Sequence, residues 1–150
     1  MTPGRGRVRS LAAIAVAAAL AAPGLALGHA LILAPASRTG ADFYTSGPCG
    51  VGRVGPTKVM RAGSVVAVRW RMDITHPPQS FSISFSAAGD RRFRVLKAGI
   101  PAPPEGVAVT TRVRLPDTPT TRGTIQLIQH GSPPGEHTYY SCSNVRLTGH

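Results

Sequence analysis

The sequence predicts an all-β protein, an immunoglobulin-like or fibronectin-III-like antiparallel β-sandwich. Three observations support this prediction. Apolar and polar residues alternate in short runs, clusters of glycine and proline separate these runs, and no segment repeats its apolar residues with the period of a helix. Six or seven short strands separated by turns, in roughly 120 residues, are typical of this kind of sandwich.

The alternating runs define the expected strands. In the first run, Val68, Trp70 and Met72 fall on one face because side chains alternate along a strand, so we expect the Trp70 indole in the core. Turns rich in glycine and proline separate the runs. The expected strands are Ser64–Met72, Phe81–Phe85, Phe93–Leu96, Val107–Leu115, Thr124–Ile128 and Tyr139–Leu147.

The first 28 residues have the pattern of an export signal. Met1–Ser10 contains three arginines, and Leu11–Ala22 is an apolar run too short to span a bilayer, which takes roughly 20 apolar residues. Ala26 and Gly28 are small residues of the kind that signal peptidase accepts. We therefore expect cleavage before His29, and the alternative is a cut after Ala26.

The expected mature chain, residues 29–150, has the length of one domain. Residues 1–28 hold three of the 17 Lys and Arg residues and none of the six Asp and Glu residues, so the mature chain carries a formal charge of +8. This charge favours anionic partners, but the positive residues are scattered through the strands without interleaved aromatic rings, so we expect no nucleic-acid binding and interpret them as a solvated strand face. We expect a secreted or periplasmic monomer that is free of the membrane. The scattered residues are Arg69, Arg71, Arg91, Arg92, Arg94, Arg112 and Arg114.

Cys49 and Cys142 are the two cysteines of the chain. Because an exported protein meets an oxidising compartment, we expect them to form a disulfide that ties the N-terminal segment to the last strand. Such a bridge across a long loop is worth on the order of 4 kcal/mol. The alternative, a thiolate copper site, requires reduced sulfur and is less favoured outside the cell.

A histidine at the start of a chain offers a metal two nitrogens from one residue, the α-amine and the imidazole Nδ1. Cleavage before His29 would create this chelating pair, whereas in the precursor the same backbone nitrogen is an amide. Amine and imidazole nitrogens suit Cu(II), which heads the affinity order of the divalent metals, so copper is the expected cofactor. A second imidazole would complete the site, and the candidates are His76, His130, His137 and His150. His150 is disfavoured because chain ends fray.

The start of the mature chain resembles that of bacterial lytic polysaccharide monooxygenases, since His29-Ala30 is followed by Pro35-Ala36-Ser37-Arg38. A set of small secreted bacterial proteins described as polysaccharide-monooxygenase-like is more similar still. That resemblance rests on an ordered series of motifs that covers essentially the whole mature chain. The motifs are Gly47–Gly50, the strand with Trp70, His76–Ser86, Asp90–Phe93, Ile125–Gln129 and Tyr139–Cys142.

The resemblance implies a histidine brace, in which His29 and His76 together bind one copper ion, with His130 as the reserve for the second position. It also implies that Tyr139 places an aromatic ring beside the copper axis. Related copper proteins that do not oxidise a substrate add an aspartate ligand, and Asp90 or Asp42 would have that role.

Two functions from different classes follow. As an enzyme, the protein would be a secreted mono-copper monooxygenase that cleaves a polysaccharide oxidatively, with Tyr139 at the copper axis and Glu136, Gln126 and Gln129 beside the open position. As a binding protein, it would capture copper and hand it to a copper-delivery partner, and an aspartate ligand such as Asp90 would favour this role. We expect the monooxygenase-like function. A metal-free adhesive module would explain the sandwich but not the cleavage before His29.

Overall fold

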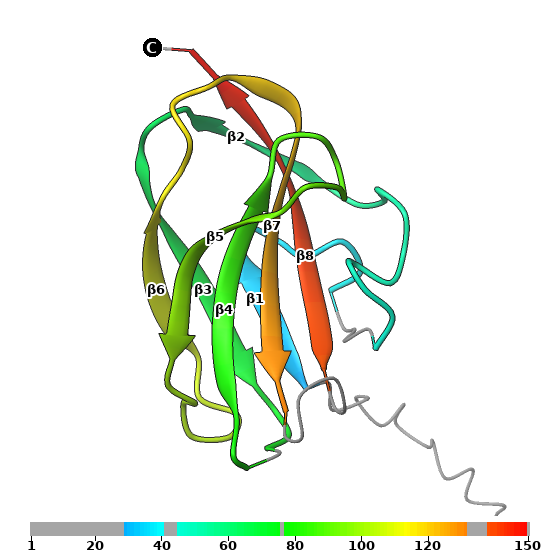
Figure 1. Cartoon of the computed structure of the whole chain (residues 1–150), viewed down its shortest axis with the longest axis vertical. Coiled ribbons are helices and arrows are strands. Elements are labelled where there is room, and N and C mark those ends of the chain that lie inside the picture. Colours follow the sequence, from blue (N-terminus) through cyan, green and yellow to red (C-terminus); the bar gives the residue numbers. More distant parts are fainter. Residues whose placement is uncertain (1–28, 41–44, 76, 132–137, 150) are drawn as a thin grey trace, which may run out of the picture.

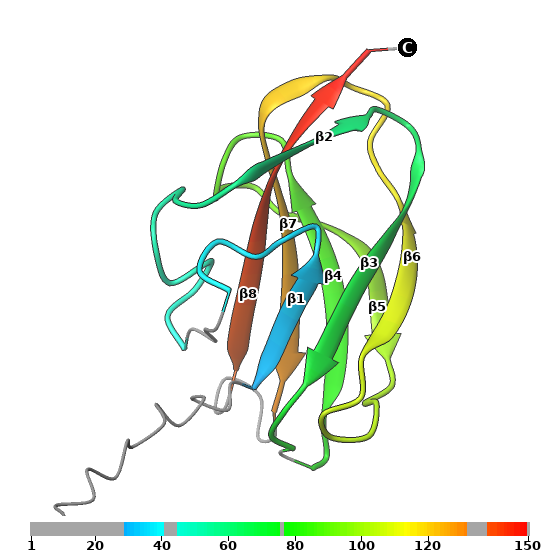
Figure 2. The same ribbon diagram turned by 180° about the vertical axis from the view of Figure 1, so that it is seen from behind.

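Two β-sheets that face each other make up the computed structural model, which describes residues 29–40, 45–75, 77–131 and 138–149 (Figures 1 and 2). These residues form eight strands and no helix, which confirms the predicted all-β sandwich. No helix in this part of the chain has the length and apolar character needed to cross a membrane. The strands are β1 (Ala30–Ala34), β2 (Thr57–Arg61), β3 (Val65–Met72), β4 (Ser80–Ser86), β5 (Arg94–Ile100), β6 (Val109–Arg114), β7 (Thr120–His130) and β8 (Tyr139–Thr148).

The smaller sheet has the strand order β1-β3-β6, and the larger sheet has the order β2-β8-β7-β4-β5. All pairs are antiparallel except β2 and β8, which run parallel. The sequence predicted β3 to β8 but neither β1 nor β2. In β1 three consecutive residues, Ala30 to Ile32, are buried, and β2 is an exposed strand at a sheet edge, so neither shows the alternation on which the prediction depended.

The core lies between the two sheets and draws apolar side chains from both. Trp70 is fully buried there, as predicted, and its ring lies 4.8 Å from that of Phe81 on the opposite sheet. Its indole Nε1 donates a hydrogen bond to Thr111 Oγ1 at 3.0 Å, so the polar atom of the side chain is satisfied inside the core.

Two hydrogen bonds hold β1 and the residue that follows it against β8, although β1 and β8 belong to different sheets. The N–H of Ile32 donates to Ser141 Oγ at 3.0 Å, and Ser143 Oγ donates to the carbonyl of Pro35 at 2.8 Å. Serine side chains of β8 therefore close the sandwich along this edge. They also bring the residues that precede β1 and β8 to the same end of the molecule.

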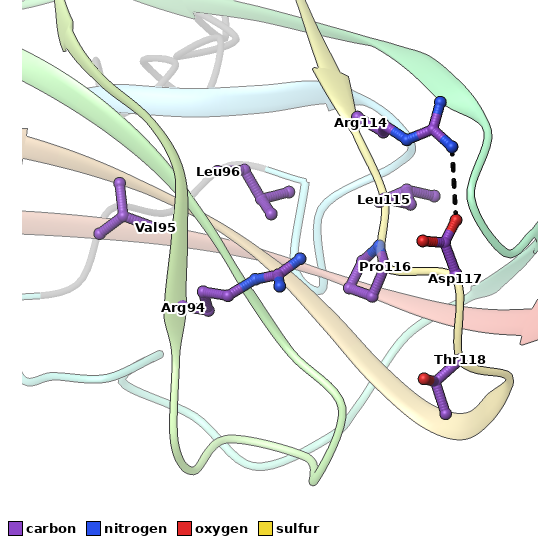
Figure 3. Close-up of a pocket in the computed structure, with 8 residues that line it drawn as sticks. All are labelled: Arg94, Val95, Leu96, Arg114, Leu115, Pro116, Asp117 and Thr118. Carbon is purple, nitrogen blue, oxygen red and sulfur yellow. Dashed lines mark hydrogen bonds and ion pairs between the residues drawn. The ribbon is translucent and has the colours of Figure 1, made fainter.

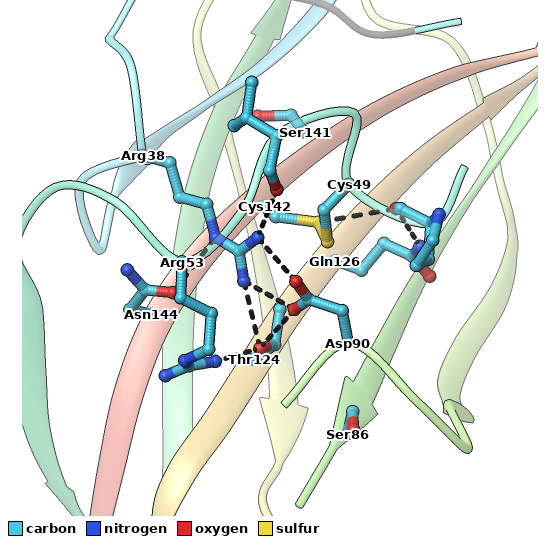
Figure 4. The surroundings of a disulfide bond; sticks show 12 residues. Arg38, Cys49, Arg53, Ser86, Asp90, Thr124, Gln126, Ser141, Cys142 and Asn144 are labelled. Atoms are coloured by element: carbon cyan, nitrogen blue, oxygen red, sulfur yellow. Dashed lines mark hydrogen bonds and ion pairs between the residues drawn. A yellow bond between two sulfur atoms is a disulfide. The ribbon is translucent and has the colours of Figure 1, made fainter. Parts of the chain in front are cut away.

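The described residues between β1 and β2 pack over the outer surface of β7 and β8, where the predicted disulfide is confirmed (Figure 4). Cys49 and Cys142 are bonded, with their Cα atoms 5.7 Å apart. Beside the bridge, Gln126 Nε2 donates to the carbonyl of Pro48 at 2.5 Å. The disulfide thus anchors this long segment to the last strand, as the sequence analysis expected.

Arg38 is the centre of a buried polar network next to the disulfide (Figure 4). Its guanidinium is bonded to both carboxylate oxygens of Asp90, at 2.8 and 2.5 Å, and its Nε donates to Asn144 Oδ1 at 3.0 Å. Thr124 Oγ1 donates to Asp90 at 3.1 Å and accepts from Arg53 at 2.6 Å. Because the Arg38 side chain is only 2% exposed, this network compensates the burial of its charge.

The electrostatic surroundings of Asp90 make the fold sensitive to acid. Burial alone would raise the pKa of Asp90, but hydrogen bonds from Arg38 and its positive charge outweigh this effect and hold the pKa below the ordinary value. Burial, followed by the charge of Arg38, lowers the pKa of Arg53. A lowered carboxyl pKa contributes stability above the unfolded value, near pH 3.9, and this contribution is lost as the pH falls through the folded value.

We expect Asp90→Asn to lower the free energy of unfolding at pH 7 by about 2 kcal/mol, as for other hydrogen bonds to charged groups. The difference from the wild type should shrink as the pH falls below about 4, because the wild-type carboxylate is then protonated as well. Denaturant unfolding at a series of pH values measures this. Asp117→Asn is the matched control, since Asp117 pairs with Arg114 at the exposed surface. A constant difference between wild type and Asp90→Asn down to pH 2 would contradict the prediction.

Candidate metal centre

His29 lies directly before β1 and is buried, with 8% of its surface exposed. Its carbonyl accepts a hydrogen bond from the N–H of Asp73 at 2.7 Å. This bond extends the pairing of β1 with β3 by one residue beyond Ala30 and Met72. The histidine that is expected to begin the mature chain is therefore fixed at the end of the smaller sheet.

Tyr139, the first residue of β8, stacks on the imidazole of His29. The two ring centroids are 3.5 Å apart and the ring planes differ by 11°. Tyr139 is also buried, with 7% of its surface exposed. One aromatic face thus covers one face of the imidazole, and the contact joins a residue of the smaller sheet to a residue of the larger one.

Gln129 lies opposite Tyr139 in the β7–β8 pairing and is fully buried. Its Nε2 donates to the carbonyl of Ile74 at 3.1 Å and to Gln79 Oε1 at 2.8 Å. Ile74 follows β3 and Gln79 precedes β4, so Gln129 holds both ends of the β3–β4 connection. The structure therefore brings His29, Tyr139 and Gln129 to one end of the sandwich.

Several predicted site residues lie outside the described part of the chain. His76 falls between the described residues Thr75 and Pro77, and the others are Asp42, Glu136, His137 and His150. Within the described ranges, no three His, Cys, Asp or Glu side chains come together as a metal site.

The structure does not bring Asp90 to His29. Asp90 bonds to Arg38 and Thr124, and Thr124 lies five residues along β7 from Gln129. At the usual rise of a strand, five residues correspond to about 16 Å. Gln126, expected beside the open position, is bonded to the segment over the disulfide instead.

His130, the reserve for the second position, lies at the exposed end of β7. Its Nε2 shares a hydrogen bond of 2.8 Å with Ser82 Oγ, and partial burial lowers the pKa of its imidazole. His130 follows Gln129 directly, and side chains alternate along a strand, so it faces the opposite side of the sheet from Gln129. His130 therefore lies at the same end of the sandwich as Tyr139 and His29, but on the opposite side of the larger sheet.

Asp73 is a residue of this region that the sequence analysis did not single out. Its side chain is 6% exposed, and its carboxylate is bonded to Arg71 Nε at 3.0 Å. Residues directly opposed in an antiparallel pair point to the same side, so Asp73 and His29 share a face of the smaller sheet. A single aspartate after a strand carries no sequence signal, and only the pairing of β1 with β3 reveals its place.

The described strands define the protein as an immunoglobulin-like β-sandwich. No family model matches the sequence, and a search of curated proteins found no match. Among solved structures, the fold is similar to that of an AA10 lytic polysaccharide monooxygenase from Streptomyces lividans. The two chains share 17% identity with a TM-score of 0.49, and the similarity covers 69% of this chain and 65% of that one. The chain thus spans just under two thirds of the length of that protein.

Proposed function

We propose that the mature protein is a secreted mono-copper protein with a monooxygenase-like function, the oxidative cleavage of a polysaccharide. His29 and His76 would hold the metal. The observation that carries this proposal is the stacking of Tyr139 on the buried imidazole of His29, at the end of the sandwich, with Asp90 held elsewhere by Arg38.

The donors that His29 offers fit copper. Its imidazole is held in place by the ring of Tyr139, and its backbone is held by Asp73, so both would be preorganised for a metal. Cleavage before His29 would add an amine nitrogen to the imidazole nitrogen, and this is a donor set that Cu(II) favours. The amine must lose its proton to bind, which a metal enforces near neutral pH because the reference pKa is about 7.7 to 8.0.

The assignment of His76 as the second ligand is supported by its neighbours in the chain. The connection that contains it leaves β3 at Asp73, which is bonded to His29, and continues through Ile74, which is bonded to Gln129. This connection therefore begins beside His29 and is held in place by the strand that pairs with Tyr139. His130 lies on the other side of its strand and lacks these links.

Tyr139 and Gln129 would have different roles beside His29 in a copper monooxygenase site. Tyr139 covers one face of the imidazole and keeps other side chains from approaching there, and Gln129 fixes the connection that bears His76. When bound, copper would supply the redox chemistry by which O₂ or H₂O₂ hydroxylates a carbon beside a glycosidic bond. Glu136 stays a prediction for a polar group beside the reacting position.

A copper carrier is the alternative, and an aspartate ligand that closes the site would favour it. Asp90 does not supply that ligand, because its carboxylate is engaged by Arg38 and Thr124. This engagement supports an open site and hence the enzyme.

We expect His76→Ala to weaken Cu(II) binding by about 100-fold or more, equivalent to about 2.8 kcal/mol, because one of three nitrogen donors is lost. The wild type should give a tetragonal, nitrogen-rich EPR spectrum that changes in the variant. His130→Ala is the matched control and should leave both the affinity and the spectrum unchanged. A larger effect of His130→Ala would show that the second ligand is misassigned.

The enzymatic function is tested separately with copper-loaded wild-type protein, ascorbate and a panel of insoluble glycans that includes chitin and cellulose. We expect oxidised oligosaccharides in the mass spectrum, and none from His76→Ala. Tight copper binding by the wild type without any oxidised product would exclude the monooxygenase-like function and leave the carrier.

A further inference from the structure

The outward side of the smaller sheet gathers arginines that are far apart in the sequence. In β3, Val68, Trp70 and Met72 point into the core, so the odd-numbered residues point outward. The pairing of β3 with β6 places Ala67 opposite Arg112 and Val65 opposite Arg114, and opposed residues share a side. The arginine face, as we name this surface, therefore carries Arg69, Arg71, Arg112 and Arg114.

The positive charge of the arginine face is only partly neutralised by the described residues. Arg69 and Arg112 are exposed and form no ion pair with any of them. Arg71 bonds to Asp73, and Arg114 reaches Asp117 at 3.4 Å, but the latter two side chains are 68% and 75% exposed. Such an exposed pair is worth little and opens readily toward another anion.

A hollow of about 530 Å³ continues the arginine face beyond the end of β6 (Figure 3). It lies between β5 and the turn that follows β6, and its volume is in the range of ligand pockets. Arg94 of β5 and Arg114 both line it, so it joins the face directly. The rest of its lining is Val95, Leu96, Leu115, Pro116, Thr118 and Asp117. The Asp117 carboxylate forms the exposed ion pair with Arg114, which an anionic ligand would have to open.

The composition of the arginine face indicates which polymer fits it. The residues between its arginines are Val65, Ala67 and Thr110, so it offers no aromatic ring on which a nucleic-acid base would stack. Guanidinium groups pair with carboxylates through two parallel hydrogen bonds. From the level of Arg71 to that of Arg114, which lies opposite Val65, the face extends six residues of β3, or about 20 Å.

We propose that the arginine face and the adjoining hollow bind a linear anionic polysaccharide whose sugars carry carboxylates. The chain lies along Arg71, Arg69 and Arg112, and one sugar enters the hollow, where Arg94 and Arg114 meet its carboxylate. The face begins beside Asp73 and thus beside His29, but binding of the glycan does not require a metal. This inference goes beyond the proposed function, and either one can fail without the other.

The test measures binding of the metal-free mature protein, kept in EDTA, to polygalacturonate, to neutral dextran and to duplex DNA at low salt. We expect binding to polygalacturonate and not to dextran. Arg69→Gln with Arg112→Gln should weaken it about tenfold, as for the loss of two exposed ion pairs. The matched control is Arg61→Gln with Arg146→Gln, which removes the same charge from exposed positions on β2 and β8. Thermal unfolding should be unchanged in both double variants because all four side chains are exposed.

An equal loss in the two double variants would mean that only net charge matters and would overturn the proposal. So would an absence of binding to polygalacturonate, or tighter binding to duplex DNA, which would make nucleic acid the occupant. Arg94→Gln tests the hollow and should weaken binding about threefold, the effect of one exposed ion pair. If Arg94→Gln leaves the affinity unchanged, the hollow takes no part in binding.

Discussion

A mature chain that begins at His29 will bind Cu(II) about 1,000-fold more tightly than a chain that begins at Gly24, a difference of about 4.1 kcal/mol. In the longer chain the backbone nitrogen of His29 is an amide, so the amine donor is lost while the imidazole stays. The extension has five residues because a free amine one or two residues before His29 would lie within reach of the imidazole and create a different copper site.

Competition with a chelator of known affinity measures this difference, and copper should raise the Tm of the mature form far more than that of the extended form. Unfolding of both metal-free forms is the control, and their Tm values should agree within a few degrees. Equal copper affinity of the two forms would show that the α-amine is not a copper ligand, which would contradict the histidine brace.

Replacing both Cys49 and Cys142 by alanine should lower the free energy of unfolding by about 4 to 5 kcal/mol, the chain-entropy value for a loop of about this length. The bridge closes a loop across 93 positions. Denaturant unfolding measures the loss. The network around Arg38 still holds the segment in the variant, so we expect the native fold to persist in the absence of denaturant.

The wild type under reducing conditions is the matched control for the double variant, since it lacks the bridge but keeps both sulfur atoms. The two should unfold at closely similar denaturant concentrations. A loss below about 1 kcal/mol in both would mean that the unfolded chain is already compact around this loop, contrary to the chain-entropy account.

The sequence predicted the fold class well because apolar and polar residues alternate along most strands, even in β4, β7 and β8, where the polar positions are buried too. β3 alternates strictly between exposed and buried residues, so its period is visible without any tertiary information. β1 has consecutive buried residues because it pairs with β3 in its own sheet and also packs against β8 of the other sheet. Its sequence therefore shows no alternation that would distinguish it from any other short apolar run. The parallel pairing of β2 with β8 depends on the path of the preceding segment, which local patterns do not encode.

The candidate site was also predictable only in part, because local patterns do not reveal contacts between distant parts of the chain. The sequence singled out His29, Tyr139 and Gln129, which the structure brings to one end of the sandwich. It considered Asp90 as a ligand because the resemblance to histidine-brace copper proteins implied that an aspartate could join the site. The buried guanidinium of Arg38 engages this carboxylate across a separation of 52 residues, and such a partner is visible only in the folded chain.

The burial of His29 has a consequence for the order of events in the proposed maturation. A peptidase needs an accessible, extended substrate, yet in the folded protein His29 is 8% exposed and the next residue, Ala30, is 1% exposed. If the chain is cut before His29, as proposed, the cut would therefore have to precede closure of the sandwich. Folding would then fix the new terminus at the end of the smaller sheet, with its imidazole against the ring of Tyr139.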